Sequence, residues 1–237
     1  MKDIIKSGLI ELGLAEKVPE NAPELLERYG QLLIEKNQVM NLTAITDPDQ
    51  VAKLHMLDCA ALLSCADFEG KTLIDVGTGA GFPGLALKIL VPSLEITLLD
   101  SLNKRVTWLN EVIGELGLTG ITAIHARAEE QAQVKGFRDS FDFVTARAVA
   151  DLRLLSEICL PYAKVGGTFL SMKSVDSAQE VENAAHAVKF LGGRFRDQVD
   201  YTIPGTDVTH RVLRIDKVAP TLKGYPRRWA NIQKKPL

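Results

Sequence analysis

A short glycine-rich stretch holds the residues of this chain whose types and spacing are best suited to chemistry. An apolar run ends at Asp75, and four glycines follow within eight residues: Gly77, Gly79, Gly81 and Gly84. Glycines let the backbone turn tightly and approach a ligand, and the amide groups at a helix start attract anions. Pro83 suits a first helical position, where a missing N–H is harmless. The stretch therefore predicts a strand, a ligand-binding turn and a helix.

The spacing of these residues distinguishes between kinds of nucleotide site. Phe82 stands where the dinucleotide pattern G-x-G-x-x-G requires its last glycine, and no Gly-Lys-Ser/Thr follows as in a P-loop. The pattern D-x-G-x-G-x-G is similar to motif I of S-adenosylmethionine (SAM) methyltransferases. We therefore expect SAM as cofactor, S-adenosylhomocysteine as its product, and a cofactor site that includes Asp75, Gly77, Gly79 and Gly81. A tight turn without a ligand is the alternative, but it needs fewer glycines.

Further polar residues lie where predicted strands end, which is where parallel sheets bind ligands. Asp100 ends the second strand, so its carboxylate can accept both hydroxyls of a ribose. Its alternative role is to start the next helix. Ala128 and Glu129 follow the third strand, where a loop can face an adenine. Arg147 and Lys173 end the fourth and fifth strands.

Two cations occupy the first turn of a helix predicted over residues 102–116. Lys104 and Arg105 oppose the helix dipole there, by up to about 1 kcal/mol each. A nearby anion, either an RNA phosphate or a carboxylate of the protein, would explain their placement, and a solvated pair is the alternative. We expect these two residues, together with Arg227 and Arg228 near the C-terminus, to contact RNA.

The surroundings of Arg147 narrow the kind of methyl acceptor. Methyltransferases that modify exocyclic amines carry an Asn/Asp-Pro-Pro-aromatic turn at this point, and the turn is absent. A catalytic Pro-Cys is absent too, because the nearby Cys159 falls within a predicted helix. The remaining candidates are methyl acceptors that need neither this turn nor a catalytic cysteine. Guanine N7 is one of them, because its lone pair attacks without losing a proton. We nominate no general acid or base, and expect Arg147 and Lys173 to position cofactor or phosphate.

Alternating apolar patterns predict an α/β fold. Strands are expected at 72–76, 95–99, 121–125, 141–145 and 167–172, with helices at 83–91, 102–116, 151–163 and 176–190. Two further strands near 194–202 and 210–217 are close enough to form an antiparallel pair. This alternation indicates a mostly parallel sheet with helices on both faces. The expected architecture is the seven-stranded, Rossmann-like fold of SAM methyltransferases.

Three regions are expected along the chain. Residues 1–66 form a small helical N-terminal region, with helices over 1–15, from Pro23 to about Asn37, and from Asp47. Residues 67–218 form the SAM-binding methyltransferase domain, and residues 219–237 form a basic C-terminal tail. The apolar stripe of the N-terminal helices must pack on a neighbour, and the methyltransferase domain is the expected one.

Composition limits the partners and the compartment. The 237 residues are 46% hydrophobic and 24% charged, which suits a globular protein with a full core. The net charge of −2 gives no global basic field, yet six cations and no acid lie from Lys217 onward. A basic tail on an acidic body fits an anionic partner, and a solvated tail is the alternative.

The chain shows no sign of a metal site, a signal peptide or a membrane anchor. Its three cysteines match no zinc spacing. Charges interrupt the N-terminus and every apolar run. We expect a cytoplasmic protein with reduced thiols, without a metal or a membrane partner.

Six motifs in register resemble the RsmG (GidB) family of bacterial methyltransferases. They are Asn41-Leu42-Thr43-Ala44-Ile45, His55-x-x-Asp58, the glycine stretch, Asp100-Ser101-x-x-Lys104-Arg105, Arg127-x-Glu129 and Ala146-Arg147-Ala148. The resemblance runs from about residue 30 to 175. Members of this family use SAM to methylate N7 of one guanine in 16S ribosomal RNA. The C-terminal Tyr225-Pro226-Arg227-Arg228 is similar to the tail of members from Gram-positive bacteria.

The resemblance implies a set of cofactor contacts and a partner. Its cofactor contacts fall on Gly77, Phe82, Ala128, Glu129 and Arg147. Packing of the phenyl ring beside the cofactor would account for the missing third glycine. The implied partner is 16S ribosomal RNA or the small ribosomal subunit, not DNA, and we expect a monomer. Ser174 follows Lys173 where the family usually has glycine, which leaves the role of this lysine open.

Three other functions stay open at the level of sequence. A nucleotide-dependent oxidoreductase is disfavoured by Phe82 and Pro83. A non-catalytic ribosome-binding module with a relict pocket is disfavoured by the intact acidic and glycine residues between Asp75 and Asp100. A SAM methyltransferase for another RNA, a protein or a small molecule is disfavoured only by the family resemblance and the basic tail.

Overall fold

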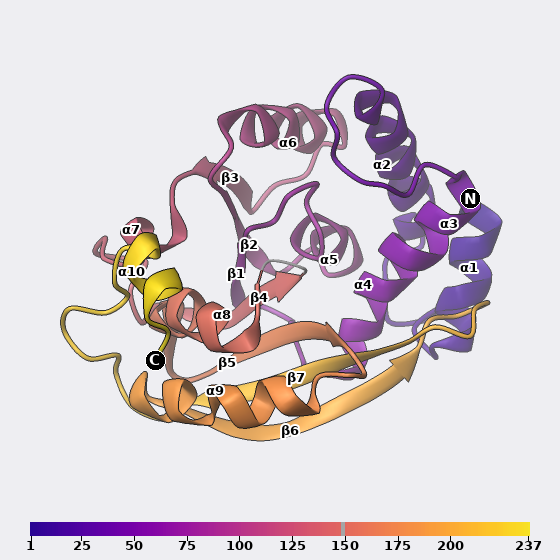
Figure 1. Ribbon diagram of the computed structural model, residues 1–237. Coiled ribbons are helices and arrows are strands. Elements are labelled where there is room, and N and C mark those ends of the chain that lie inside the picture. The colour runs from indigo at the N-terminus through magenta and orange to yellow at the C-terminus, as the bar shows by residue number, and fades with distance from the viewer. Residues whose placement is uncertain (148–149) are drawn as a thin grey trace.

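A seven-stranded mixed sheet forms the centre of the molecule, seen in a computed structural model that describes residues 1–147 and 150–237 (Figure 1). The strands are β1 (Thr72–Val76), β2 (Glu95–Asp100), β3 (Ile121–His125), β4 (Phe141–Arg147), β5 (Ala163–Ser174), β6 (Gly193–Thr202) and β7 (Thr209–Lys217). Their order is β3-β2-β1-β4-β5-β7-β6. The first five are parallel, and β7 runs antiparallel to both neighbours. The predicted α/β fold and its antiparallel pair are confirmed.

The parallel strands are buried on both faces because helices cover both. Leu73 and Ile74 are adjacent in β1 and both inaccessible to solvent, yet they belong to different hydrophobic clusters. Successive side chains of a strand point to opposite faces, so one apolar run supplies two cores. This explains why the central strands read as continuous apolar segments.

The N-terminal helices share the first of these cores with the sheet. On this side lie α1 (Lys2–Glu11), α2 (Ala22–Asn37), α3 (Pro48–Val51), α4 (Asp58–Ala60), α5 (Gly84–Leu90) and α6 (Asn103–Glu115), with η1 (Ala52–Leu57) and η2 (Ala61–Ser64) flanking α4. One hydrophobic cluster runs from Ile5 and Leu26 to Leu85 and Leu98. The expected packing on the sheet domain is therefore present. No described helix has both the length and the apolar character needed to cross a bilayer.

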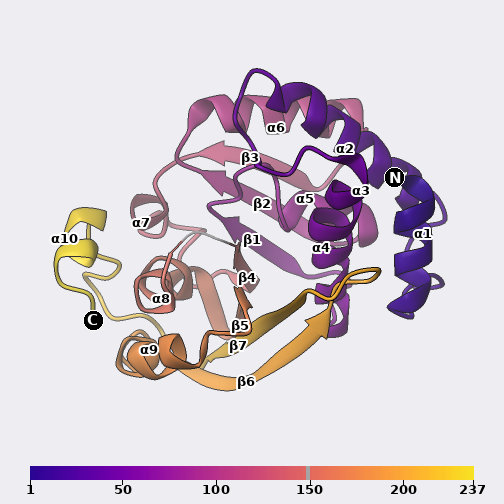
Figure 2. The ribbon, with the colours of Figure 1, turned by 45° about the vertical axis from the view of Figure 1, so that its right-hand side comes forward.

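The second core lies under helices that come later in the chain. They are α7 (Ala128–Gln131), α8 (Leu152–Cys159), η3 (Leu160–Tyr162), α9 (Ala178–Phe190) and α10 (Trp229–Lys234). Figure 2 shows α10 at the end of the molecule opposite the N-terminal helices. The short α7 and α10 are not predicted by the sequence, because one or two turns carry too little periodicity. Likewise, the helix expected over 151–163 ends at Cys159 and continues as η3.

The C-terminal segment is folded onto the body. Lys217, the first of the six cations that lie towards this end of the sequence, is 1% exposed. Its ammonium group donates to Asp139 Oδ1 at 2.8 Å, the Leu160 carbonyl at 2.6 Å and Thr221 Oγ1 at 2.7 Å. Three acceptors satisfy all three donors of the buried cation, which offsets its loss of water. The picture of a solvated tail is thus wrong for this residue.

The glycine turn after β1 needs its glycines for two separate reasons. Gly77, Gly79 and Gly81 have φ values of 73°, 60° and 97°, a region that side chains disfavour. At Gly81 space is lacking as well, because an added Cβ would lie 2.6 Å from Tyr29 Oη and 2.9 Å from Leu109 Cδ2. The N-terminal helix α2 therefore packs directly against the turn.

Replacing Gly81 by alanine should cost more stability than backbone conformation alone explains. Gly117 is a matched control, because its φ is 62° and an added Cβ would meet nothing within 4 Å. We expect Gly117→Ala to cost about 1–2 kcal/mol, and Gly81→Ala to cost about 1–3 kcal/mol more through overpacking. Urea denaturation of both variants measures the difference. Equal costs would mean that Tyr29 moves away freely.

Candidate functional site

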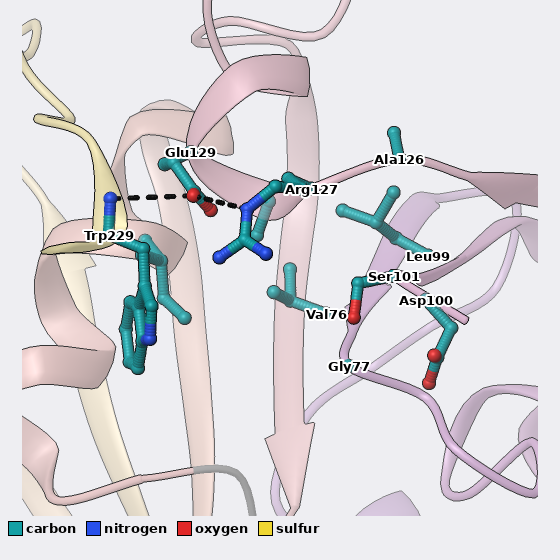
Figure 3. A pocket seen from close by; sticks show the side chains of 11 residues that line it. Val76, Gly77, Leu99, Asp100, Ser101, Ala126, Arg127, Glu129 and Trp229 are labelled. Carbon is teal, nitrogen blue, oxygen red and sulfur yellow. Dashed lines mark hydrogen bonds and ion pairs between the residues drawn. The ribbon is translucent and has the colours of Figure 1, made fainter.

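A cavity of about 330 Å³ opens at the carboxyl ends of β1, β2 and β3 (Figure 3). Its lining residues are Val76, Gly77, Leu99, Asp100, Ser101, Ala126, Arg127, Ala128, Glu129, Ile158 and Trp229. We call it the first cavity. Four residues predicted for the cofactor site from sequence line it, namely Gly77, Asp100, Ala128 and Glu129. The topology brings them together because adjacent parallel strands end at the same edge.

Asp100 connects the glycine turn to the start of α6. Its carboxylate is 3% exposed, with Oδ2 accepting from Gly79 N and Oδ1 from Leu102 N, both at 2.9 Å. Arg105 Nη1 lies 3.4 Å from Oδ2, so this cation of the α6 first turn faces a carboxylate of the protein. Each carboxylate oxygen has two acceptor sites. Oδ2 has two donors and Oδ1 has one, so Oδ1 of Asp100 keeps one acceptor site for a ligand.

Glu129 is held from two sides at the other end of the first cavity. The side chain is 7% exposed, and Oε1 accepts from Arg127 Nε at 2.7 Å and from the backbone N–H of Trp229 at 3.4 Å. Figure 3 shows the carboxylate between these two donors. Sequence reasoning missed Trp229, because its position 100 residues away follows no motif spacing. Its aromatic character within a basic segment was the one available signal.

Asp75 holds the glycine turn through hydrogen bonds and does not line the first cavity. It is inaccessible to solvent, and its carboxylate accepts from Thr78 Oγ1 at 2.6 Å, Gly84 N at 3.0 Å and Thr145 Oγ1 at 3.2 Å. Burial raises the pKa of Asp75 to about 6, although the three donors favour the ionised form. In this structure Asp75 supports the turn, α5 and β4, and its predicted contact with the cofactor stays a prediction.

A second cavity, of about 470 Å³, lies where β4 and β5 end beside η1. Its lining residues are Ile45, Leu54, His55, Asp58, Arg147, Met172, Lys173, Ser174, Val208 and His210. Arg147 and Lys173, both predicted as positioning residues, meet here and do not line the first cavity. Lys173 Nζ lies 2.7 Å from Glu180 Oε2 and also 2.7 Å from the Ala150 carbonyl. Ala148 of the sequence motif lies outside the described residues.

Arg147 is held by the helical region and covers the ring of Phe82. Its Nη1 donates to Asp58 Oδ2 and its Nη2 to His55 Nδ1, both at 2.9 Å. The guanidinium carbon lies 5.0 Å from the Phe82 ring centroid, within the range of a cation–π contact. The His55 ring stacks on the same phenyl ring at 4.6 Å. Phe82 and Arg147 are thus neighbours, as a shared site requires.

Asp58 joins four elements through one buried carboxylate. It is 1% exposed, and Oδ1 accepts from His210 Nδ1 and Tyr201 Oη, each at 2.7 Å, while Oδ2 accepts from Arg147. Burial alone would raise the pKa of Asp58, but the hydrogen bond from His210 and the charge of Arg147 lower it below its usual value. The same hydrogen bond raises the pKa of His210. Asp58 is therefore an anion with all its partners in place.

The contacts of His55 assign its proton to Nε2. Nδ1 lies 3.1 Å from the Leu54 carbonyl and 2.9 Å from Arg147 Nη2, and the second contact decides the tautomer. A guanidinium can only donate, so Nδ1 is the acceptor towards Arg147. Nε2 then donates to Thr43 Oγ1 at 2.9 Å. Burial, followed by the positive charge of Arg147, lowers the pKa of His55 to about 4. A second positive charge beside Arg147 would break this arrangement.

The four predicted RNA contacts fall into two groups. Lys104 and Arg228 are exposed. Arg105 faces Asp100, and Arg227 binds Glu157 through Nη2 at 2.6 Å and Nε at 2.8 Å. The last two guanidinium groups have structural partners, so Lys104 and Arg228 are the better candidates for phosphate.

The lowered pKa of His55 should make stability depend on pH. Between about pH 6.5 and 4 the unfolded chain binds a proton at this residue and the folded chain does not, so stability falls as pH falls. We expect His55→Gln, which keeps an acceptor for Arg147, to remove up to roughly 3 kcal/mol of this loss. Urea unfolding of both proteins at several pH values measures it. Parallel curves would contradict the assignment.

Comparison with known proteins identifies the chain's relatives. The profile described as GidB, rRNA small subunit methyltransferase G, matches residues 22–201. A ribosomal RNA small subunit methyltransferase G from Clostridium perfringens is 42% identical over 236 residues, covering 99% of this chain and 98% of the relative. One from Alkaliphilus metalliredigens is 45% identical over 240 residues, covering 100% and 98%.

Solved structures show the same fold. The crystal structure of a SAM-dependent methyltransferase from Aquifex aeolicus has a TM-score of 0.51 to this chain at 20% identity, covering 72% of this chain and 94% of its own. The seven-stranded sheet, with its reversed last pair, is thus the fold shared with SAM-dependent methyltransferases. Together with the extensive identity to its relatives, the match over residues 22–201 shows that this chain belongs to the rRNA small subunit methyltransferase G family.

Proposed function

We propose that the protein transfers a methyl group from SAM to N7 of a specific guanine in 16S ribosomal RNA. The observation that carries the choice of N7 is that two titratable groups of the second cavity, Asp58 and His55, are already engaged by hydrogen bonds. Asp58 accepts from three donors, and His55 accepts from Arg147. Neither group is available to remove a proton from a substrate. Guanine N7 suits such a site because its lone pair is already exposed.

SAM is the cofactor, and the residues of the first cavity fit its nucleoside half. The Asp100 carboxylate has the chemistry to accept ribose hydroxyls. Gly77 brings bare backbone to the cavity wall, and Val76, Leu99 and Ile158 supply apolar surface for a flat ring. The bound cofactor supplies a methyl group activated by a positively charged sulfur. Its methionine half would extend along the glycine turn.

The second cavity suits a nucleobase that has left its stack. Ile45, Leu54, Met172 and Val208 offer apolar contact, while Lys173 and His210 add polar groups at the same opening. RNA enzymes of this kind act on bases that are splayed out of the helix. The first cavity lies at the ends of β1, β2 and β3 and the second at the ends of β4 and β5, and β1 and β4 are neighbours in the sheet, so cofactor and base would meet between these two strand ends.

The proposed reaction is a single in-line displacement. The N7 lone pair forms a bond to the methyl carbon while the carbon–sulfur bond breaks, and its electrons stay on S-adenosylhomocysteine. No proton moves, and the product base carries the positive charge. Asp58 and His55 hold Arg147 on Phe82, which keeps this cation off the base as its charge develops. The chain thus contributes mainly positioning, worth up to roughly 7–11 kcal/mol.

Transfer of labelled methyl from SAM to small ribosomal subunits tests the substrate. The subunits come from a strain that lacks this gene, and cleavage at N7-methylguanine maps the modified base. We expect one labelled guanine in 16S RNA, because a built cavity selects one geometry. Naked ribosomal RNA and bulk tRNA are the controls. Label in another RNA, or on another guanine atom, would refute the proposed specificity while the fold and cofactor stand.

Salt dependence tests the proposed phosphate contacts. Each lost contact should lower the slope of log binding constant against log salt concentration by about 0.7 to 0.9. We therefore expect Lys104→Ala with Arg228→Ala to flatten the slope for 16S RNA by about 1.4 to 1.8. Lys189→Ala, an exposed lysine of α9, is the control and should leave the slope unchanged. Equal slopes in all proteins would remove both residues from the RNA interface.

A further inference from the structure

The last 20 residues, 218–237, are fixed to the body by hydrogen bonds from distant side chains. We call them the C-terminal segment. The Arg138 guanidinium donates to the carbonyls of Thr221 at 2.8 Å, Leu222 at 3.1 Å and Tyr225 at 2.7 Å. Gln133 Nε2 donates to the Pro226 carbonyl at 3.0 Å. The backbone of the segment is thus held in place well before it reaches the first cavity.

A buried ion pair fixes the segment immediately before the cavity. The Glu157 carboxylate of α8 is inaccessible to solvent and receives Nε, Nη2 and the backbone N–H of Arg227 at 2.6–3.0 Å. Beyond it, Ile232 of α10 is fully buried in the second core. A buried carboxylate is costly without a partner, so this pair holds the two elements together.

These attachments place Trp229 on the wall of the first cavity. Its backbone N–H reaches Glu129 Oε1, and Trp229, Glu129 and Ile158 all line the same cavity. Figure 3 shows the indole at the end away from Asp100, with Glu129 and Arg127 between them. If Asp100 receives the ribose, the adenine extends towards this end. A half-buried aromatic wall there is suited to a base.

We propose that Trp229 recognises the adenine ring of SAM and of S-adenosylhomocysteine, and that the C-terminal segment is built to hold it there. This inference rests on the proposed cofactor site and deepens it. Lys217, which directly precedes the segment, and Arg227 within it are both engaged by internal acceptors. The other cations of the segment, Lys223, Arg228, Lys234 and Lys235, are exposed. Lys217 and Arg227 instead hold the segment against the body, which positions the aromatic wall.

Tryptophan fluorescence reports the contact directly. The chain has two tryptophans, and Trp108 is 3% exposed within α6, away from the cavity lining. Trp108→Phe makes Trp229 the sole fluorophore. Titrating this variant with S-adenosylhomocysteine should change its emission saturably. Adenosine should produce the same change at higher concentration, and methionine should produce none.

The contribution of Trp229 to binding is tested by calorimetry, which measures the affinity for S-adenosylhomocysteine. We expect Trp229→Ala to raise the Kd for S-adenosylhomocysteine about 5- to 150-fold, which is the size of a base–aromatic contact, and Trp229→Phe to recover part of it. Leu222→Ala is the matched control, because it removes an exposed apolar side chain of the same segment, 54% accessible, that does not line the cavity. Its Kd should stay within twofold of the unmodified chain. Thermal unfolding verifies that the variants are folded.

The outcomes separate this inference from the proposed function. Tight binding by Trp229→Ala, or a flat emission of the Trp108→Phe variant on saturation, would overturn the role of Trp229 and leave the cofactor site intact. If the unmodified chain binds no S-adenosylhomocysteine, the cofactor site itself fails, and this inference falls with it. A large loss of affinity in Trp229→Ala with normal folding supports it.

Discussion

The buried carboxylate of Asp75 is the interaction on which the site depends. It is inaccessible to solvent, so it would be costly without partners. Its three donors come from the glycine turn, the start of α5 and β4, which fixes these three elements relative to one another. The turn then presents Gly79 N–H to Asp100, which couples the ends of β1 and β2. This chain of hydrogen bonds holds the turn and the end of β2, and both line the first cavity.

A second constraint joins the N-terminal helices to the same turn. Tyr29 of α2 is fully buried and donates its hydroxyl to the Ala80 carbonyl. Phe82 packs against Tyr29, His55 and Arg147, and Arg147 pairs with Asp58. The helical region therefore forms one wall of the second cavity in addition to covering the sheet. The π-helical turn η1, which contains His55, is an irregularity of the kind found at functional sites.

The local sequence pattern was sufficient to predict features that depend only on neighbouring residues. Apolar runs located the strands of the sheet, and Asp47 caps the third helix through Gln50 N with Pro48 at its first position. Gly77, Asp100 and Glu129 could be predicted to share a site, because parallel strands end at one edge of the sheet and ligands bind there. That rule does not distinguish residues that line a cavity from residues that support it. Asp75 belongs to the same sequence motif, yet its side chain is buried and does not line the first cavity.

The sequence by itself determined the fold class, the glycine turn and the family, because these depend on periodicity and on spacing within a few residues. Only the tertiary structure decided which side chains share a cavity. Predicted site residues line two separate cavities. Asp58 has partners on β6 and β7, and the backbone of Trp229 contacts Glu129. These pairs are about 100 residues or more apart in sequence. Their meeting depends on burial and charge pairing across the whole molecule, which no local pattern records.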